Sequence, residues 1–449
     1  MKYCIQTFGC QMNENDSVFI ASLLQSAGYS KAESMAEADI IVVNTCCVRQ
    51  SAENKAFGYI GSLKRFKEKN ADVVIAVCGC MVQKDGNAAA FLHKARHVGI
   101  LCGTFAISRL PEYIAEYQGR GEVIVDIEQN HQQPEALPID TRFTEYSYKV
   151  QVNIIYGCDN FCTYCIVPYV RGRERSRAPQ HILDEVRALA KAGVREVQLL
   201  GQNVNSYGKD LAEDSWDFAR LLQELDEIEE LRRIRYMTSH PRDFSAELVD
   251  VVVDSRHICH HFHLPLQAGC DKILAAMNRG YNTAYYGRLL EIIRQKTPNA
   301  TITSDLIVGF PGETEQDFQQ TLDFVAHCQF DTAYTFLYSE RSGTPAAQMP
   351  QQVSAEVKKE RLQRLMTIQN PISLRHNQKL IGQTQNILVE GPSKNRNDHW
   401  YGRNDGNKIV VFPYIADSGI EAGSIIPIEI RQAQTWNLYG LLRSPSCEL

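Results

Sequence analysis

Three cysteines near the middle of the chain have the type and spacing needed to hold a redox-active metal cluster. Cys158, Cys162 and Cys165 lie in the segment YGCDNFCTYC, with a C-x3-C-x2-C pattern. Three thiolates on one loop can bind three irons of a [4Fe-4S] cluster and leave the fourth open to chelate S-adenosylmethionine and pass an electron to its sulfonium. The alternative is a zinc knuckle, but structural zinc needs four ligands, and no fourth Cys or His follows within the loop. The spacing therefore predicts a radical S-adenosylmethionine enzyme.

Polar and aromatic residues follow the strands that we predict after this loop. In a barrel of parallel strands the active site lies at the carboxyl ends of the strands, so we expect such residues to contact S-adenosylmethionine. The alternatives are ordinary turns, aromatic packing and buried polar groups with a structural role. The candidate contacts are Tyr164, Gly201, Gln202, Asn203, Ser239, Gln267 and Asp305.

A second set of cysteines is spread over the first part of the chain. Cys10, Cys46 and Cys80 each come just after a predicted strand, in QTFGC, VVNTC and AVCGC. In a parallel sheet these strand ends share one edge, so the three thiolates could hold a second cluster. The alternative is that small buried cysteines fill a core. Three neighbouring cysteines have no assigned role, and the last of them also follows a strand: Cys47, Cys78 and Cys102.

The elements that position these residues alternate between strands and helices. Strands predicted at 2–7, 40–44, 73–77 and 98–101, with helices at 15–27 and 51–69, indicate a doubly wound parallel sheet over residues 1–125. A polar segment with two prolines predicts a linker at 126–143. Six further strands predict a partial (βα)6 barrel over 144–376, at residues 150–155, 197–201, 234–238, 260–264, 301–307 and 333–338. Short alternating strands at 385–389, 408–412 and 425–430 predict a small all-β domain over 378–444.

Composition limits the classes of protein that fit. The chain has 449 residues, 44% of them hydrophobic, and a formal net charge of −6, so it is not a general polyanion binder. Fourteen cysteines occur without a signal peptide and without an apolar run near the ~20 residues of a membrane span. We therefore expect a cytoplasmic protein that has no membrane partner and uses its cysteines as metal ligands.

A run of alternating arginines follows the central cysteine loop. If this segment is extended, the four side chains share one face near the site and could bind phosphates of RNA. The alternative is a solvated loop face. The four residues are Arg171, Arg173, Arg175 and Arg177.

At these motifs the chain resembles the methylthiotransferase family of radical enzymes, and within it the MiaB-type enzymes of tRNA. The resemblance covers essentially the whole chain and implies an N-terminal methylthiotransferase domain, a radical barrel and a C-terminal TRAM domain. The family's ligands correspond to Cys10 in GCQMN, Cys46 in NTCCVR and Cys80 in GCMV, beside the central triplet. The segment GRNDGNKIVVFP is similar to the TRAM pattern and implies contact with tRNA, with Asn404 in place of the usual Thr.

The resemblance also implies a reaction. The substrate would be N6-dimethylallyladenosine at position 37 in the tRNA anticodon stem-loop. The enzyme would hold two [4Fe-4S] clusters, one to generate a radical from S-adenosylmethionine and one to supply sulfur for insertion at C2. A second S-adenosylmethionine would supply the methyl group. The enzyme would need an electron donor such as flavodoxin or ferredoxin, and a sulfur source.

Three alternatives remain open. One is a methylthiotransferase acting on threonylcarbamoyladenosine in tRNA or on a ribosomal protein. Another is a radical methyltransferase that inserts no sulfur. A zinc-bearing RNA-binding protein without enzymatic activity is the third.

Overall fold

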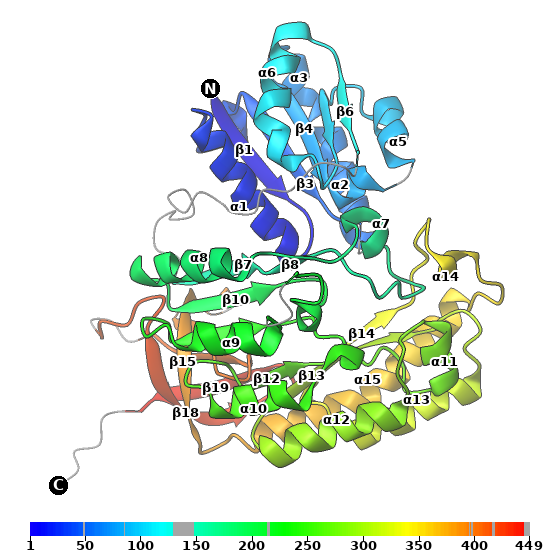
Figure 1. Ribbon diagram of the computed structural model, residues 1–449, viewed down its shortest axis with the longest axis vertical. Coiled ribbons are helices and arrows are strands. Elements are labelled where there is room, and N and C mark those ends of the chain that lie inside the picture. The colour runs from blue at the N-terminus through cyan, green and yellow to red at the C-terminus, as the bar shows by residue number, and fades with distance from the viewer. Residues whose placement is uncertain are drawn as a thin grey trace.

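The computed structural model describes residues 1–47, 50–84, 86–128, 148–212, 216–394, 396, 398–414 and 418–443. The chain forms three parts, each with its own core: an N-terminal sheet, a barrel of parallel strands and a small β-barrel near the C-terminus (Figure 1). Most of the segment predicted as a linker lies outside the described residues. In the described part of the chain, no helix is long and apolar enough to cross a bilayer.

The N-terminal part is a six-stranded parallel sheet in the order β2-β1-β3-β4-β5-β6, with helices on both faces (Figure 1). The central strands IIVVNT and VIAVCG are buried along their whole length, as continuous apolar runs in a parallel sheet should be. The strands are β1 (Lys2–Thr7), β2 (Ser30–Lys31), β3 (Ile40–Thr45), β4 (Val74–Gly79), β5 (Ile100–Cys102) and β6 (Ile124–Asp126). The helices are α1 (Gln11–Ser26), α2 (Gln50–Ser62), α3 (Lys64–Lys69), α4 (Cys80–Gln83), α5 (Asn87–Lys94) and α6 (Leu110–Arg120).

The middle part confirms the prediction of a partial barrel with six parallel strands. It consists of two three-stranded sheets, β11-β10-β7 and β12-β13-β14, which an isolated parallel bridge links between β11 and the residues before β12. The strands are β7 (Lys149–Asn153), β10 (Glu196–Leu200), β11 (Arg233–Tyr236), β12 (His261–His263), β13 (Thr301–Val308) and β14 (Thr332–Leu337). The covering helices are α8 (Pro179–Lys191), α9 (Phe218–Asp226), α10 (Ala246–Asp254), α11 (Asp271–Ala276), α12 (Thr283–Lys296), α13 (Glu315–Cys328) and α15 (Ala355–Gln378).

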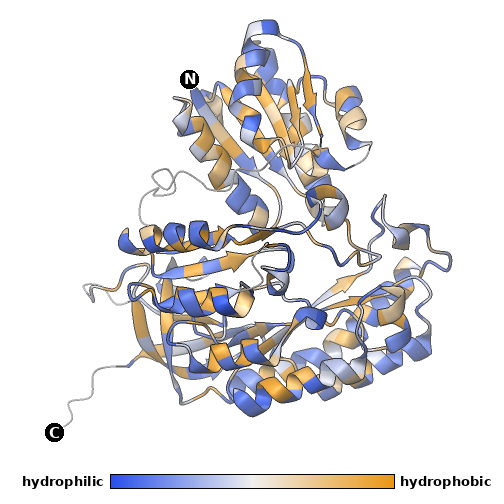
Figure 2. Ribbon diagram, in the orientation of Figure 1, coloured by the Kyte–Doolittle hydropathy of each residue, from blue (hydrophilic) through white to orange (hydrophobic). Residues whose placement is uncertain are grey.

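Short elements connect this barrel to its surroundings. β8 (Ile155–Tyr156) pairs with β9 (Arg175–Ser176), α7 (Val167–Arg171) lies between them, and α14 (Pro345–Gln348) follows β14. Pro371 lies inside α15 without ending it. Hydropathy colouring shows apolar residues along the strands of the barrel and a mixture of apolar and polar residues in the helices around them (Figure 2).

The last part is a closed barrel in the order β15-β16-β17-β19-β18, which confirms the predicted all-β domain. Its strands are β15 (Thr384–Pro392), β16 (His399–Arg403), β17 (Ile409–Pro413), β18 (Ile425–Ala433) and β19 (Asn437–Leu442).

The turn between β16 and β17 attaches this domain to the amino-terminal ends of the large barrel's strands. Arg233 Nη1 donates to the Arg403 carbonyl at 2.7 Å, Arg235 Nη1 to the Asp405 carbonyl at 2.9 Å, and the His260 amide to Asp405 Oδ2 at 2.8 Å. Asn404 is only 4% exposed. The large barrel therefore covers Asn404, and RNA contact by the rest of the GRNDG segment stays a prediction.

Two buried clusters of ion pairs join the N-terminal domain to the barrel. Asp16 on α1 accepts from Arg171 on α7 at 2.7 Å. Glu53 on α2 lies 3.5 Å from Lys84 Nζ and 4.0 Å from Arg341 Nη1, which follows β14. Because these charges are almost fully buried, each depends on its partner across the interface.

Candidate active site

All cysteines of the two sets except Cys46 line one cavity of about 340 Å3 between the N-terminal sheet and the carboxyl ends of the barrel strands. Its wall includes Val167 and Val170 of α7, a helix that lies below the sheet in Figure 1. Cysteines from both domains line it, together with Arg171, Arg279 and the ends of β10, β11 and β13. The cysteines in its wall are Cys10, Cys80, Cys158, Cys162 and Cys165.

The barrel triplet is held on a tight loop directly after β8. Gly157 has φ +74°, and a Cβ there would lie 1.9 Å from the Arg173 carbonyl oxygen, so only glycine fits before Cys158. Asn160 Nδ2 donates to Cys158 Sγ at 3.4 Å, and Arg279 Nη1 donates to Cys162 Sγ at 3.2 Å. These two donors suit sulfur atoms that carry negative charge, as cluster-bound thiolates do.

Burial raises the pKa of the Cys158 thiol to about 11 and that of Cys165 to about 12. Iron binding would displace these protons, because a metal ligates the thiolate. Among the described residues, no three or more His, Cys, Asp or Glu side chains converge to hold a single metal ion. A cubane cluster does not require such convergence, since each thiolate binds a different iron.

The N-terminal cysteines follow three neighbouring strands of one parallel sheet. Cys10 comes after β1 and is the N-cap of α1, Cys46 follows β3, and Cys80 begins α4 directly after β4. Gly79 has φ +98°, and a Cβ there would lie 2.5 Å from the Thr45 carbonyl oxygen, so the approach of β4 to β3 at this edge depends on glycine. The shared edge expected from the sequence is therefore present.

Hydrogen bonds organise these strand ends. Asn13 Nδ2 donates to Asn44 Oδ1 at 3.1 Å and to the Thr45 carbonyl at 3.0 Å, while its Oδ1 accepts from Cys10 Sγ at 3.3 Å. A hydrogen bond with Cys46 is the largest effect on the Cys10 thiol and lowers its pKa to about 6, against the effect of burial and with help from Arg171. Cys10 therefore loses its proton readily. Asn13 is a structural residue of the site that sequence reasoning missed, although it lies in the motif CQMN.

The structure contradicts the prediction that Arg171 binds RNA phosphates. This residue is 7% exposed, lies in the cavity wall and donates to Asp16 Oδ2 at 2.7 Å. It also interacts electrostatically with Cys10 and Cys80. The extended segment assumed from the sequence is absent here, since α7 ends at Arg171. Arg171 instead places a positive charge between the two domains, beside the N-terminal thiols.

The remaining arginines of this run differ from one another. Arg177 is 6% exposed and pairs with Glu185 at 2.6 Å, so the prediction of an RNA contact is wrong there too. Arg175 lies over the ring of Phe105. Only Arg173 has an exposed side chain, in which 71% of the surface is accessible, and it is 3.4 Å from Asp159.

The residues expected to contact S-adenosylmethionine divide into two groups. All but one lie in the cavity wall, and three of these have buried oxygen atoms without a hydrogen-bond partner: Gln202 Oε1, Ser239 Oγ and Gln267 Oε1. Unpaired polar atoms facing one cavity suit a polar ligand. Asn203 is the exception, because it is 1% exposed and its amide bonds to Asp243 Oδ2 at 2.7 Å and to the His240 amide at 3.0 Å.

Arg279 and His240 also line the cavity, and of these two only Arg279 escaped the sequence analysis. Arg279 is 4% exposed and donates to the Tyr164 hydroxyl at 3.3 Å and to the Pro265 carbonyl at 2.9 Å, which joins the cysteine loop to the end of β12. His240 has an unpartnered Nε2, and burial together with Arg279 and Arg242 lowers its pKa to about 2. The imidazole is therefore neutral. No motif marked Arg279, which lies far from the cysteines in the sequence, whereas His240 directly follows the candidate Ser239.

The cysteines without an assigned role lie away from the cavity wall. Cys47 packs in the core on one face of the N-terminal sheet, and Cys78 and Cys102 face each other across β4 and β5 on the opposite face. Their burial fits the alternative of core filling.

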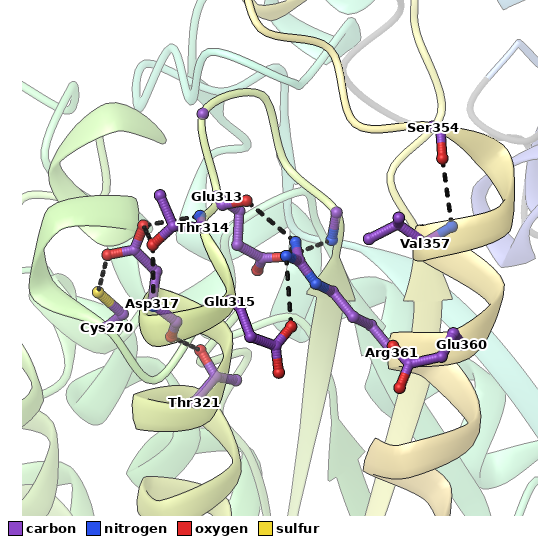
Figure 3. Close-up of polar contacts among 12 residues, drawn as sticks. Cys270, Glu313, Thr314, Glu315, Asp317, Thr321, Ser354, Val357, Glu360 and Arg361 are labelled. Atoms are coloured by element: carbon purple, nitrogen blue, oxygen red, sulfur yellow. Dashed lines mark hydrogen bonds and ion pairs between the residues drawn. The ribbon is translucent and has the colours of Figure 1, made fainter.

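The turn after β13 is held by a polar network beside the site (Figure 3). Glu313 accepts from the Gly309 amide at 2.7 Å and from the buried Arg361 guanidinium at 2.8 Å. Asp317 accepts from the Thr314 amide at 2.8 Å and from Lys272 Nζ at 2.6 Å. The Thr314 hydroxyl accepts from the Asp317 amide at 3.2 Å, so Thr314 and Asp317 form a capping box at the start of α13. The network fixes the loop between β13 and α13 near Asp305.

This cap predicts a dependence of stability on pH. Burial raises the pKa of Asp317, but hydrogen bonds from Lys272 and Thr314 outweigh it and lower the pKa to about 2. Because the folded pKa lies below the ordinary value of about 3.9, the carboxylate stabilises the fold above that pH, and this contribution is lost as the pH falls towards 2. We expect Asp317→Asn to lower the midpoint of thermal unfolding at pH 6. The difference in midpoint between the variant and wild type should become smaller as the pH approaches 3. Asp323→Asn on the exposed face of the same helix is the control, and a gap that stays constant or widens would contradict the assignment.

Comparisons with known proteins agree with this architecture. Residues 152–325 match the model of the Radical SAM superfamily, residues 2–103 that of the uncharacterized protein family UPF0004, and residues 378–442 that of the TRAM domain. The solved structure of the radical S-adenosylmethionine methyltransferase TsrM from Kitasatospora setae has a TM-score of 0.56 and 14% identity, over 77% of this chain and 74% of that one. The fold and the cysteine loop thus define a radical S-adenosylmethionine enzyme.

Relatives specify the family. A protein of Pelotomaculum thermopropionicum is 48% identical over 98% of this chain and 97% of its own length, and one of Moorella thermoacetica is 50% identical over 97% of both. Both are named tRNA-2-methylthio-N(6)-dimethylallyladenosine synthase. The chain belongs to the family of these synthases.

Proposed function

We propose that this protein transfers a methylthio group to C2 of N6-dimethylallyladenosine 37 in tRNA. The observation that carries the proposal is the single cavity lined by cysteines of both domains. Cys158, Cys162 and Cys165 would hold one [4Fe-4S] cluster, and Cys10, Cys46 and Cys80 a second. The bound clusters and S-adenosylmethionine would supply one-electron chemistry, sulfur and the methyl group, which an unactivated aromatic C–H bond requires.

The chain's own residues would orient the reactants. The unpaired oxygens of Gln202, Ser239 and Gln267 offer acceptors to a polar ligand that enters the cavity from the strand ends. Arg279 holds the cysteine loop against the end of β12. The N-terminal sheet covers the carboxyl ends of the barrel strands and so limits the access of water to the reaction.

Partners follow from the substrate. The TRAM domain and the names of the relatives support binding of tRNA. A one-electron donor such as flavodoxin or ferredoxin, and a source of sulfur, would be needed for turnover. The number of cysteines in the chain, fourteen, fits a cytoplasmic location, where thiols stay reduced.

Anaerobic turnover with dimethylallylated tRNA tests the proposal. Protein with both clusters loaded, S-adenosylmethionine and a chemical reductant should yield the 2-methylthio nucleoside, detected by mass spectrometry of digested tRNA. The same tRNA without the dimethylallyl group is the control and should give less product. Absence of the methylthio nucleoside despite two loaded clusters would contradict the proposed substrate.

A further inference from the structure

A second cavity opens beside the active site, on the outer side of the barrel. It has a volume of about 320 Å3 and lies between the loop after β10 and the N-terminal ends of α9 and α10. Its wall includes the rings of Tyr207 and Trp216, the amide of Asn205 and the ammonium group of Lys209. None of these four residues lines the cysteine cavity.

Asn205 shows that this cavity is suited to a polar ligand. The residue is 8% exposed, and neither its Nδ2 nor its Oδ1 has a hydrogen-bond partner among the described residues. A buried amide that leaves both a donor and an acceptor unpaired costs free energy, and such groups are rare in native proteins. Asn205 Nδ2 and Oδ1 are therefore available for a ligand that presents an acceptor beside a donor.

The walls favour a nucleobase over a simple anion. Asp217 and Asp243 also line the cavity, and Asp243 already pairs with Lys209 at 2.5 Å, so no excess of positive charge awaits a free phosphate. The edge of a base presents the adjacent donor and acceptor that an asparagine amide can bond. Aromatic rings beside such an amide are the usual means of holding an unpaired base of RNA. The volume lies at the small end of the range of about 300–1,000 Å3 for ligand sites, which suits one nucleoside.

The position of the cavity links it to the RNA substrate. Asp243 in its wall accepts from Asn203 Nδ2 at 2.7 Å, and Asn203 follows Gln202, which lines the cysteine cavity. Asn203 Oδ1 also accepts from the amide of His240, another residue of that cavity. The two cavities thus share one wall at the same end of the barrel. Lys209, with 55% of its side chain exposed, adds a cation at the mouth.

We propose that this cavity, which we call the Asn205 cavity, binds a second unpaired base of the tRNA loop, next to the target nucleotide. The proposal rests on the proposed function, because it assumes that an RNA loop enters the neighbouring site. Asn205 bonds the edge of the base, and Trp216 and Tyr207 form its apolar walls.

Binding of stem-loop RNA to the full-length, cluster-loaded protein tests this assignment. Fluorescence anisotropy gives Kd for an intact dimethylallylated anticodon stem-loop and for RNAs in which one unpaired loop nucleotide at a time is abasic. We expect Asn205→Leu to weaken binding of the intact RNA about tenfold. For the wild-type protein, removing the base at one position other than the target should weaken binding by a similar factor. For Asn205→Leu, removing that same base should weaken binding no further.

Thermal unfolding separates a ligand-binding role from a structural one. Asn205→Leu removes an unpaired buried amide, so its midpoint should equal or exceed that of wild type. Asn299→Leu, at an exposed position near the opposite end of the barrel, is the matched control and should leave Kd unchanged. An unchanged Kd for Asn205→Leu would overturn the proposal. An equal loss of affinity for every RNA, together with a lower midpoint of thermal unfolding, would overturn it as well. Failure of wild type itself to bind the intact stem-loop would overturn the proposed function as well.

Discussion

Replacing Cys10, Cys46 or Cys80 by alanine is expected to abolish methylthiolation of tRNA while cleavage of S-adenosylmethionine remains measurable. The three thiols belong to the N-terminal sheet, whereas Cys158, Cys162 and Cys165 are held by the barrel's own loop and by Arg279. The loss of an N-terminal ligand therefore leaves the barrel loop intact. Iron analysis of anaerobic protein should fall from about eight to about four irons per chain, which is a readout independent of activity.

Cys47→Ala is the matched control for this experiment. Cys47 neighbours Cys46 in the sequence but packs in the core of the sheet, away from the cavity wall. The Cys47→Ala variant should therefore bind both clusters and still form the methylthio nucleoside. Formation of the methylthio nucleoside by Cys10→Ala with only four irons, or loss of cleavage in all three variants, would contradict the assignment of two separate clusters.

Arg171→Ala is expected to destabilise the protein by about 3–5 kcal/mol, the usual cost of removing one partner of a buried ion pair. The substitution leaves the Asp16 carboxylate, 12% exposed, without its cation at the interface between the two domains. Urea unfolding followed by circular dichroism measures the loss. Hydrogen exchange should increase in α1 and α7, since these helices carry the two partners.

Two further variants test whether the loss of stability comes from the ion pair between Arg171 and Asp16. Arg173→Ala removes an exposed arginine of the same segment and should cost about 0–1 kcal/mol. Asp16→Leu combined with Arg171→Leu removes both charges and should recover much of the stability that the single change loses. A double variant that is no more stable than Arg171→Ala, or equal losses for Arg171 and Arg173, would show that the ion pair does not hold the domains together.

The sequence was sufficient to predict the fold where the local pattern of residues determines the structure. The central strands β3 and β4 begin with runs of four apolar residues, so their positions and parallel pairing were predictable, and with them the common edge for the three N-terminal cysteines. The short edge strands β2 and β6 were missed because a run of two or three residues is too short to show an alternating pattern of apolar and polar residues. β16 and β19 were missed because closure of the small barrel, rather than strong alternation, decides their pairing.

The candidate site was less predictable because its side chains depend on contacts between domains. Alternation of arginines suggested one extended face, but α7 places Arg171 at the interface, and Arg177, which follows β9, pairs with Glu185. Arg279 reaches the cysteine loop from the segment after α11, and no local motif marks that approach. Such charges are recognisable only after the domains are packed together.

The attachment of the small β-barrel has a consequence for the size of the substrate. The β16–β17 turn lies under the amino-terminal ends of the large barrel's strands, whereas the cysteine cavity lies at their carboxyl ends. The eight residues of β13 rise about 26 Å between these ends. An RNA that touches both must cover that distance, which equals about eight stacked nucleotides at 3.4 Å each. We therefore expect an RNA that contacts both the small barrel and the cysteine cavity to be at least that long, so that a stem-loop binds more tightly than a shorter oligonucleotide.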